Sequence, residues 1–238
     1  MSSAEYRSKL QKIRLDNFKS LVDFEMDLAA FTCLIGLNGA GKTTVLQAID
    51  FLAQLMSGQL TEWLKQRDWK ATDLLCKLTK KRTIGFSVDL QLDNGKKALW
   101  KGDFNTQTQK LYCSSETVTV DGQPELRVTE SKYALAGSAS LIPIPFTYQG
   151  SILSQLKESV LNPDLLAVKR ALQSIKSLEL LSPHLIRKSA KAADDVGVGG
   201  EKLSAFLASL PEAKKSIIID CMKDFYPDFV DYQVSSIR

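Results

Sequence analysis

The sequence predicts an α/β protein in which a glycine-rich turn, a block of antiparallel strands and a helical C-terminal part follow one another. Three observations favour this fold class. A glycine-rich segment lies between an apolar run and a helical pattern, residues 83–128 alternate apolar and polar positions, and apolar residues recur at helical spacing near the C-terminus. A length of 238 residues suffices for one large domain or two small ones.

The composition excludes several classes of protein. Hydrophobic residues make up 44% and charged residues 24%, and no apolar run approaches the ~20 residues of a membrane helix. The four cysteines have no CxxC spacing, and the single histidine, His184, excludes a three-histidine metal site within this chain. The N-terminus lacks a hydrophobic signal region, so a cytoplasmic location without a membrane partner is expected. The net charge of +4 permits contact with nucleic acid without favouring it.

The first elements can be placed in order. Residues 11–18 and 22–28 alternate in polarity and predict an antiparallel pair of strands. Residues 31–35 are apolar and predict a further strand. Residues 43–57 carry apolar positions at helical spacing, and Gly58 marks the end of that helix.

Between this strand and this helix, residues 36–43 match the pattern G-x-x-x-x-G-K-[ST], the P-loop or Walker A motif. Its glycines let backbone amides point at a phosphate, and the following helix adds its positive dipole end. Lys42 can reach the β- and γ-phosphates of ATP, and the Thr43 hydroxyl can hold Mg²⁺. The residues predicted to bind ATP are Gly36, Asn38, Gly39, Ala40, Gly41, Lys42, Thr43 and Thr44.

The remaining elements follow from local patterns. Residues 59–80 carry two short helical patterns, around Trp63 and at 74–78. The meander of residues 83–128 has turn signals at 93–95 and 121–122. Two prolines make residues 141–148 an edge or broken strand, and residues 151–160 and 162–181 are predicted to be helical, the second with Asn162 as its N-cap. The expected segments are 1–58, 59–82, 83–140 and 141–238.

Two features resemble the head domains of RecF/SMC/OLD-like ABC-type ATPases, many of which are called AAA family ATPases in bacteria. One is a short N-terminal strand that ends in Asn-Phe-Lys-Ser at residues 17–20, and the other is Asn38-Gly39 within the P-loop. The resemblance implies a P-loop ATPase with an antiparallel β subdomain and a helical lobe. It also implies Lys19 and Ser20 beside the nucleotide.

The same resemblance implies roles and partners. Gln149, after the strand that leaves the antiparallel part, would sense Mg²⁺ and the attacking water, so Lys42 and Gln149 are the expected catalytic residues and Thr43 and Gln149 the metal-binding ones. The head would pair with a second copy or with the C-terminal half of the same ATPase. DNA repair or phage defence, with DNA or an effector nuclease as partner, is the implied context.

Two segments look like further ATPase motifs and are interpreted as helices. Residues 198–202 (Val-Gly-Gly-Glu-Lys) approach the signature motif but place Val198 where the serine belongs. Residues 217–220 (Ile-Ile-Ile-Asp) approach a Walker B strand, yet Cys221 follows in place of the glutamate. Apolar residues recur at helical spacing through 203–210 and 217–225, which predicts amphipathic helices.

The chain is therefore expected to be the N-terminal portion of a longer head. Residues 226–238 predict the start of one more strand, and no Walker B strand or switch histidine follows, with His184 interpreted as a loop residue. An enzyme of this kind would hydrolyse ATP when intact, whereas this chain alone would bind nucleotide with little turnover.

Two alternatives stay open. The chain could be another P-loop NTPase or a kinase, although the Asn-Lys-x-Asp string of a GTPase is absent from the sequence. It could also be a non-catalytic interaction module that retains the P-loop as a folding element. Short basic clusters at 80–82, 96–97 and 187–188 favour solvated faces over a path for DNA.

Overall fold

A computed structural model describes residues 8–234, except for 107–110, 130, 139, 179–185, 187–192 and 198. The chain forms two compact units, Met1–Lys176 and Ser177–Arg238. The boundary falls inside the predicted segment 141–238, so that segment is divided between the two units.

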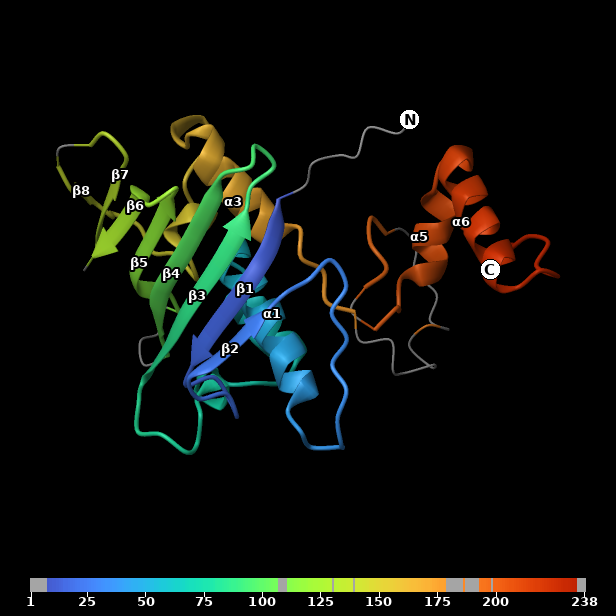
Figure 1. Ribbon diagram of the computed structural model, residues 1–238, viewed down its shortest axis with the longest axis horizontal. Coiled ribbons are helices and arrows are strands. Elements are labelled where there is room, and N and C mark those ends of the chain that lie inside the picture. The colour runs from blue at the N-terminus through green and yellow to red at the C-terminus, as the bar shows by residue number, and fades with distance from the viewer. Residues whose placement is uncertain are drawn as a thin grey trace. The chain divides into compact units, whose positions relative to one another are not determined.

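The N-terminal unit is built on one eight-stranded antiparallel sheet in the order β2-β1-β3-β4-β5-β6-β7-β8 (Figure 1). Its strands are β1 (Lys9–Asp16), β2 (Phe24–Asp27), β3 (Thr83–Gln91), β4 (Lys97–Asn105), β5 (Cys113–Val120), β6 (Gln123–Thr129), β7 (Lys132–Leu135) and β8 (Ile142–Pro143). Because β1 pairs with both β2 and β3, the predicted N-terminal pair and the predicted meander are parts of a single sheet.

The strand predictions from alternation are confirmed, and so are both tight turns. Gly95 and Gly122 have φ values of 83° and 79°, the left-handed region in which a side chain is strained. The short strand β8 lies at the edge of the sheet, so the missing N–H of Pro143 does not interrupt the hydrogen bonding of a central strand.

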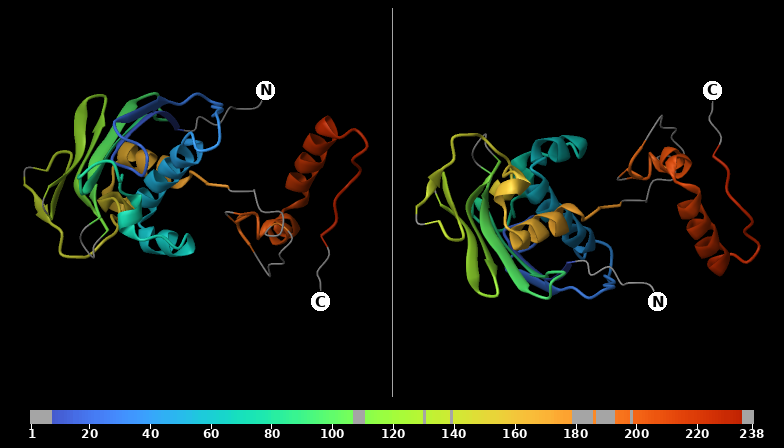
Figure 2. Two further views of the ribbon diagram at one scale, coloured as in Figure 1. Left: turned by 90° about the horizontal axis from the view of Figure 1, so that it is seen from below. Right: turned by 90° about the horizontal axis from the view of Figure 1, so that it is seen from above.

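Helices cover one face of this sheet (Figure 2). The long helix α1 (Lys42–Ser57) packs against α3 (Pro163–Gln173) and against the short helix α2 (Leu60–Gln66). Phe51 of α1 is fully buried, and its ring lies 5.1 Å from that of Phe18 and 5.3 Å from that of Phe104. No helix in the described part of the chain is long and apolar enough to span a membrane.

Three helical predictions need correction. Residues 151–160 form two short 3₁₀ helices, η2 (Ile152–Ser154) and η3 (Glu158–Val160), and α3 ends at Gln173 although Asn162 caps it as predicted. The 3₁₀ helix η1 (Ala71–Leu74) replaces the helix expected at 74–78. The reason is tertiary: the backbone N–H of Cys76 donates to the Asn17 carbonyl at 3.2 Å, which draws this segment into an extended path along the end of β1.

The C-terminal unit contains α5 (Leu203–Ser209) and α6 (Glu212–Phe225). Both predicted amphipathic helices are confirmed, and the Walker B-like residues 217–220 lie within α6. The prediction of a strand after residue 225 is wrong for residues 226–234, which form no strand. No described strand pairs with this segment, and Val230 is 80% exposed. Val198 and His184 lie outside the described residues.

A carboxyl group, that of Glu116 on β5, is buried in the core of the N-terminal unit. It accepts hydrogen bonds from Trp100 Nε1 at 2.8 Å, from the Ser151 hydroxyl and from the Ile152 backbone N–H at 3.1 Å. Glu116 thereby ties the sheet to the start of η2. Burial raises the pKa of Glu116 above its ordinary value of 4.5, and the hydrogen bond from Ser151 is the largest opposing effect.

This raised pKa predicts a pH dependence of stability. The contribution of protonated Glu116 to the free energy of unfolding is complete below about pH 4.5, the ordinary pKa of the group. It is lost as the pH rises through the higher pKa of the folded state. We expect the free energy of unfolding of the wild type to fall over that window relative to Glu116→Gln, whose amide does not titrate. Urea denaturation from pH 4 to pH 8 measures the difference, and parallel curves would contradict it.

Candidate functional site

The glycine-rich turn leads directly into α1. Gly39 and Gly41 have φ values of 82° and 84°, so both positions need glycine, and Gly41 is the N-cap of α1. The residues from 36 to 40 are exposed. The predicted order of turn and helix is therefore confirmed, with the helix starting at Lys42.

The strand predicted at 31–35 is not formed. These residues have no strand pairing, and Phe31 and Ile35 are 84% and 90% exposed. A buried strand needs hydrogen-bonded neighbours, and no described segment pairs with this one. A hollow of about 290 Å³ lies between residues 33–35 and the start of α1, lined in part by Lys42 and Val45.

The N-terminus of α1 is open toward the turn. No side chain caps it, and its first turn contains no acidic residue. The first amides of a helix have no partner within the helix, and the helix dipole places partial positive charge there. An anion is the ligand that this end of α1 suits best.

Lys42 closes the turn. Its ammonium donates to the carbonyl oxygens of Gly36 and Leu37, each at 2.8 Å. An ammonium carries three protons, so one remains for a ligand while two hold the loop. The position of Lys42 suits the binding of a phosphate in the loop, because the ammonium is already held over the loop.

The two threonines that follow differ in their surroundings. Thr43 is exposed on the first turn of α1. The Thr44 hydroxyl lies 3.4 Å from the Ser20 hydroxyl in the turn between β1 and β2. Thr43 is thus the hydroxyl that faces solvent beside Lys42, as a Mg²⁺ ligand would require.

The turn between β1 and β2 lies against the first two turns of α1. Lys19 has a φ of 50°, and its ammonium donates to Gln47 Oε1 at 2.8 Å. The same ammonium lies 3.2 Å above the ring centroid of Trp69, a cation–π arrangement. Lys19 and Ser20 are therefore brought beside the P-loop helix.

Gln47 and Trp69 were not among the residues predicted from the sequence. Gln47 lies four residues after Thr43, and this helical spacing could have placed both on one face of α1. Nothing in the sequence indicates Trp69, since its contact with Lys19 depends on the path of residues 67–76.

Gln149 is not brought to the P-loop. Its side-chain Oε1 accepts from the backbone N–H of Thr61 at 2.9 Å, at the start of α2. The adjacent Gly150 packs on the backbone of Leu55, near the C-terminal end of α1. Leu55 lies twelve positions after Thr43 in α1, a rise of about 18 Å at 1.5 Å per residue. The expected contact of Gln149 with Mg²⁺ is corrected accordingly.

The chain matches a protein-family model and resembles part of one known protein. The model of the AAA ATPase domain family matches residues 9–192. The OLD nuclease of Thermus scotoductus (strain ATCC 700910 / SA-01) is 30% identical over 107 residues, which cover 45% of this chain and 18% of that protein. The chain thus matches less than a fifth of this curated relative's length.

Solved structures give weaker likenesses. The recombination mediator RecF with ATP is 19% identical with a TM-score of 0.35, over 50% of this chain and 28% of that chain. An SMC ATPase structure is 16% identical with a TM-score of 0.35, over 48% of this chain and 70% of that chain. The family match and the OLD nuclease relative confirm the resemblance inferred from the P-loop and its preceding strand.

Proposed function

Since the chain belongs to the AAA ATPase domain family, we propose that it is the nucleotide-binding head of an ATPase and that its P-loop binds Mg-ATP. The observation that carries the proposal is the uncapped, acid-free N-terminus of α1 with the Lys42 ammonium fixed over the loop. Among the side chains described around the loop, this arrangement offers donors and positive charge where an anion would lie.

Each residue has a defined part in this proposal. The amides at the start of α1 and the ammonium of Lys42 hold the phosphates, and the hydroxyl of Thr43 holds Mg²⁺. ATP supplies the phosphoryl group and Mg²⁺ offsets its charge. Lys19 and Ser20 border the nucleotide from the turn between β1 and β2, while Gln149 takes no part.

The whole protein is proposed to hydrolyse ATP as a dimer of heads or with further ATPase segments. A role in DNA repair or phage defence is proposed from the family resemblance alone, and the relative's name adds only that this relative is a nuclease. The Walker B-like residues lie in α6, and we propose no catalytic role for them. We therefore propose that residues 1–238 alone bind ATP with little turnover.

An equilibrium titration tests the proposal. Purified 1–238 is titrated with ATP, with and without Mg²⁺, by calorimetry. We expect saturable binding of one nucleotide per chain that is tighter with Mg²⁺, because the metal links the phosphates to Thr43. Absence of binding at millimolar ATP would overturn the proposal and would favour an interaction module instead.

A further inference from the structure

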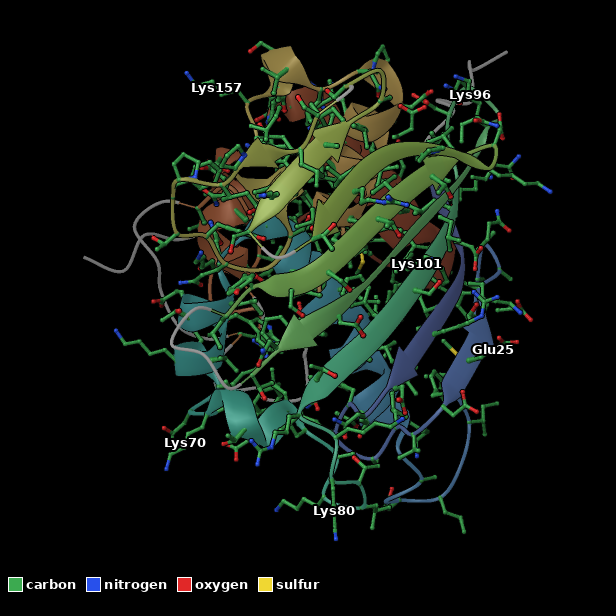
Figure 3. All side chains as sticks on the ribbon, turned by 90° about the vertical axis from the view of Figure 1, so that its left-hand side faces the viewer. Glu25, Lys70, Lys80, Lys96, Lys101 and Lys157 are labelled. Carbon is green, nitrogen blue, oxygen red and sulfur yellow. The ribbon has the colours of Figure 1, made fainter. Side chains whose placement is uncertain are left out.

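The face of the sheet opposite α1 and α3 is open (Figure 3). A hollow of about 530 Å³ lies over β3, β4, β5 and β6. One reason for the hollow is Gly85, which places no side chain on the sheet between the neighbouring Asp16 and Asp103. The P-loop contributes no residue to this hollow.

Two cations border the hollow from neighbouring strands. In the sheet register Lys101 of β4 lies opposite Thr117 of β5, and Thr117 lies opposite Arg127 of β6. With strands about 4.8 Å apart, the backbones of Lys101 and Arg127 are about 10 Å apart. Side chains of that length can converge on one group above Thr117.

These two cations differ from Arg14 and Lys12, which lie on the same face in β1. Arg14 is paired with Glu25 and Asp89, and Lys12 is paired with Glu25 and Asp27. Within the described part of the chain, neither Lys101 nor Arg127 has an ion-pair partner, although both are exposed. Their charges are therefore available to a ligand.

The hydroxyl between them is the second observation. Thr117 Oγ1 is buried and has no hydrogen-bond partner among the residues described. A buried hydroxyl without a partner costs free energy. A ligand oxygen at this position would accept from Thr117 while Lys101 and Arg127 neutralise its charge.

The next row of the sheet limits the ligand. Asp103, two residues after Lys101 on the same face, accepts a hydrogen bond from the Ser115 hydroxyl at 2.7 Å. Its carboxylate lies about 7 Å along the strand from the cation row. The site is thus positive at one end and negative at the other, which favours a single anionic group over an extended one.

We propose that Lys101, Thr117 and Arg127 form a second anion site, separate from the P-loop, that binds one phosphate group. The phosphate belongs either to a small free phosphate compound or to the backbone of a nucleic acid. Both sources offer the same oxygens, and in a nucleic acid a single backbone phosphate would occupy the site.

The test weakens the P-loop contribution first. In a Lys42→Ala background, binding of pyrophosphate and of a single-stranded oligonucleotide is measured by titration at low salt. Lys101→Gln and Arg127→Gln are each expected to weaken binding about 10-fold, since hydrogen bonds to charged groups are the stronger kind. Thr117→Val keeps the shape of the side chain and is expected to weaken binding about 3-fold.

Two further variants sharpen the result. Asp103→Asn removes a nearby negative charge and should tighten binding about 3-fold, an effect that general loss of structure would not produce. Lys80→Gln changes an exposed lysine outside the hollow and should leave binding unchanged. Circular dichroism confirms that each variant is folded.

The measured affinities either identify the source of the phosphate or overturn the proposal. If the variants weaken pyrophosphate binding, the site takes a free phosphate compound, and if they weaken only oligonucleotide binding, it takes a nucleic-acid phosphate. If neither probe binds, or if binding is unchanged in Lys101→Gln and Arg127→Gln, the proposal is wrong. Because the P-loop lysine is already absent, this result is independent of ATP binding by the wild type.

Discussion

Replacing Lys42 by alanine is expected to weaken ATP binding about 10- to 100-fold. The variant loses a charge-assisted hydrogen bond to the phosphates, which contributes about 1.5–3 kcal/mol. It also loses the two 2.8 Å bonds to the carbonyls of Gly36 and Leu37 that hold the turn closed. Calorimetric titration of both proteins with Mg-ATP measures the change.

The matched control is Lys77→Ala, which removes an exposed lysine outside the P-loop. It should bind ATP as the wild type does. Lys77→Ala should keep the wild-type free energy of unfolding to within about 0.5 kcal/mol, since surface substitutions seldom cost more. Circular dichroism checks that Lys42→Ala, which loses two hydrogen bonds in the turn, is still folded. Equal ATP affinity of Lys42→Ala and the wild type would show that the turn is not the nucleotide site.

Local sequence patterns predict the strands of the sheet, the turn before α1 and the helix α6, because local interactions determine these elements. Alternation of apolar residues placed β3, β4 and β5, since each strand must bury one face on the helices. Glycine spacing placed the turn before α1, and helical periodicity placed residues 217–220 in α6 rather than in a strand.

The failures concern residues whose positions depend on distant parts of the chain. The edge strand predicted at 141–148 is limited to Ile142–Pro143, so Gln149 does not follow it directly. The location of Gln149 is decided by the packing of Gly150 on Leu55. An apolar run such as 31–35 has strand composition, but forming a strand requires a partner that the described residues do not supply. The Lys19–Trp69 contact and the buried Glu116 likewise arise from tertiary packing.

A buried ion pair joins α1 to the segment after α2, and it predicts the largest effect on stability. The side chains of Asp50 and Arg67 are only 6% and 11% exposed, and Arg67 Nη2 donates to Asp50 Oδ2 at 2.7 Å. Trp63 Nε1 donates to the same oxygen at 2.7 Å. One carboxylate therefore satisfies two donors on the insertion that follows the P-loop helix.

Asp50→Ala is expected to lower the free energy of unfolding by about 3–5 kcal/mol, because it leaves the Arg67 charge buried without its carboxylate. Urea denaturation measures the loss. The double variant Asp50→Ala/Arg67→Met should recover part of it, since methionine fills the volume beside the Trp63 and Trp69 rings without a charge.

The double variant also separates the ion pair from simple loss of packing. If the cost came only from the cavity left at Asp50, the two substitutions would add, and the double variant would be the least stable protein of the set. A single-variant loss below about 1 kcal/mol would place the pair among weak surface contacts. Because the N-terminal end of α1 follows the P-loop, loss of stability in Asp50→Ala should also weaken ATP binding, and its recovery in the double variant should restore that binding.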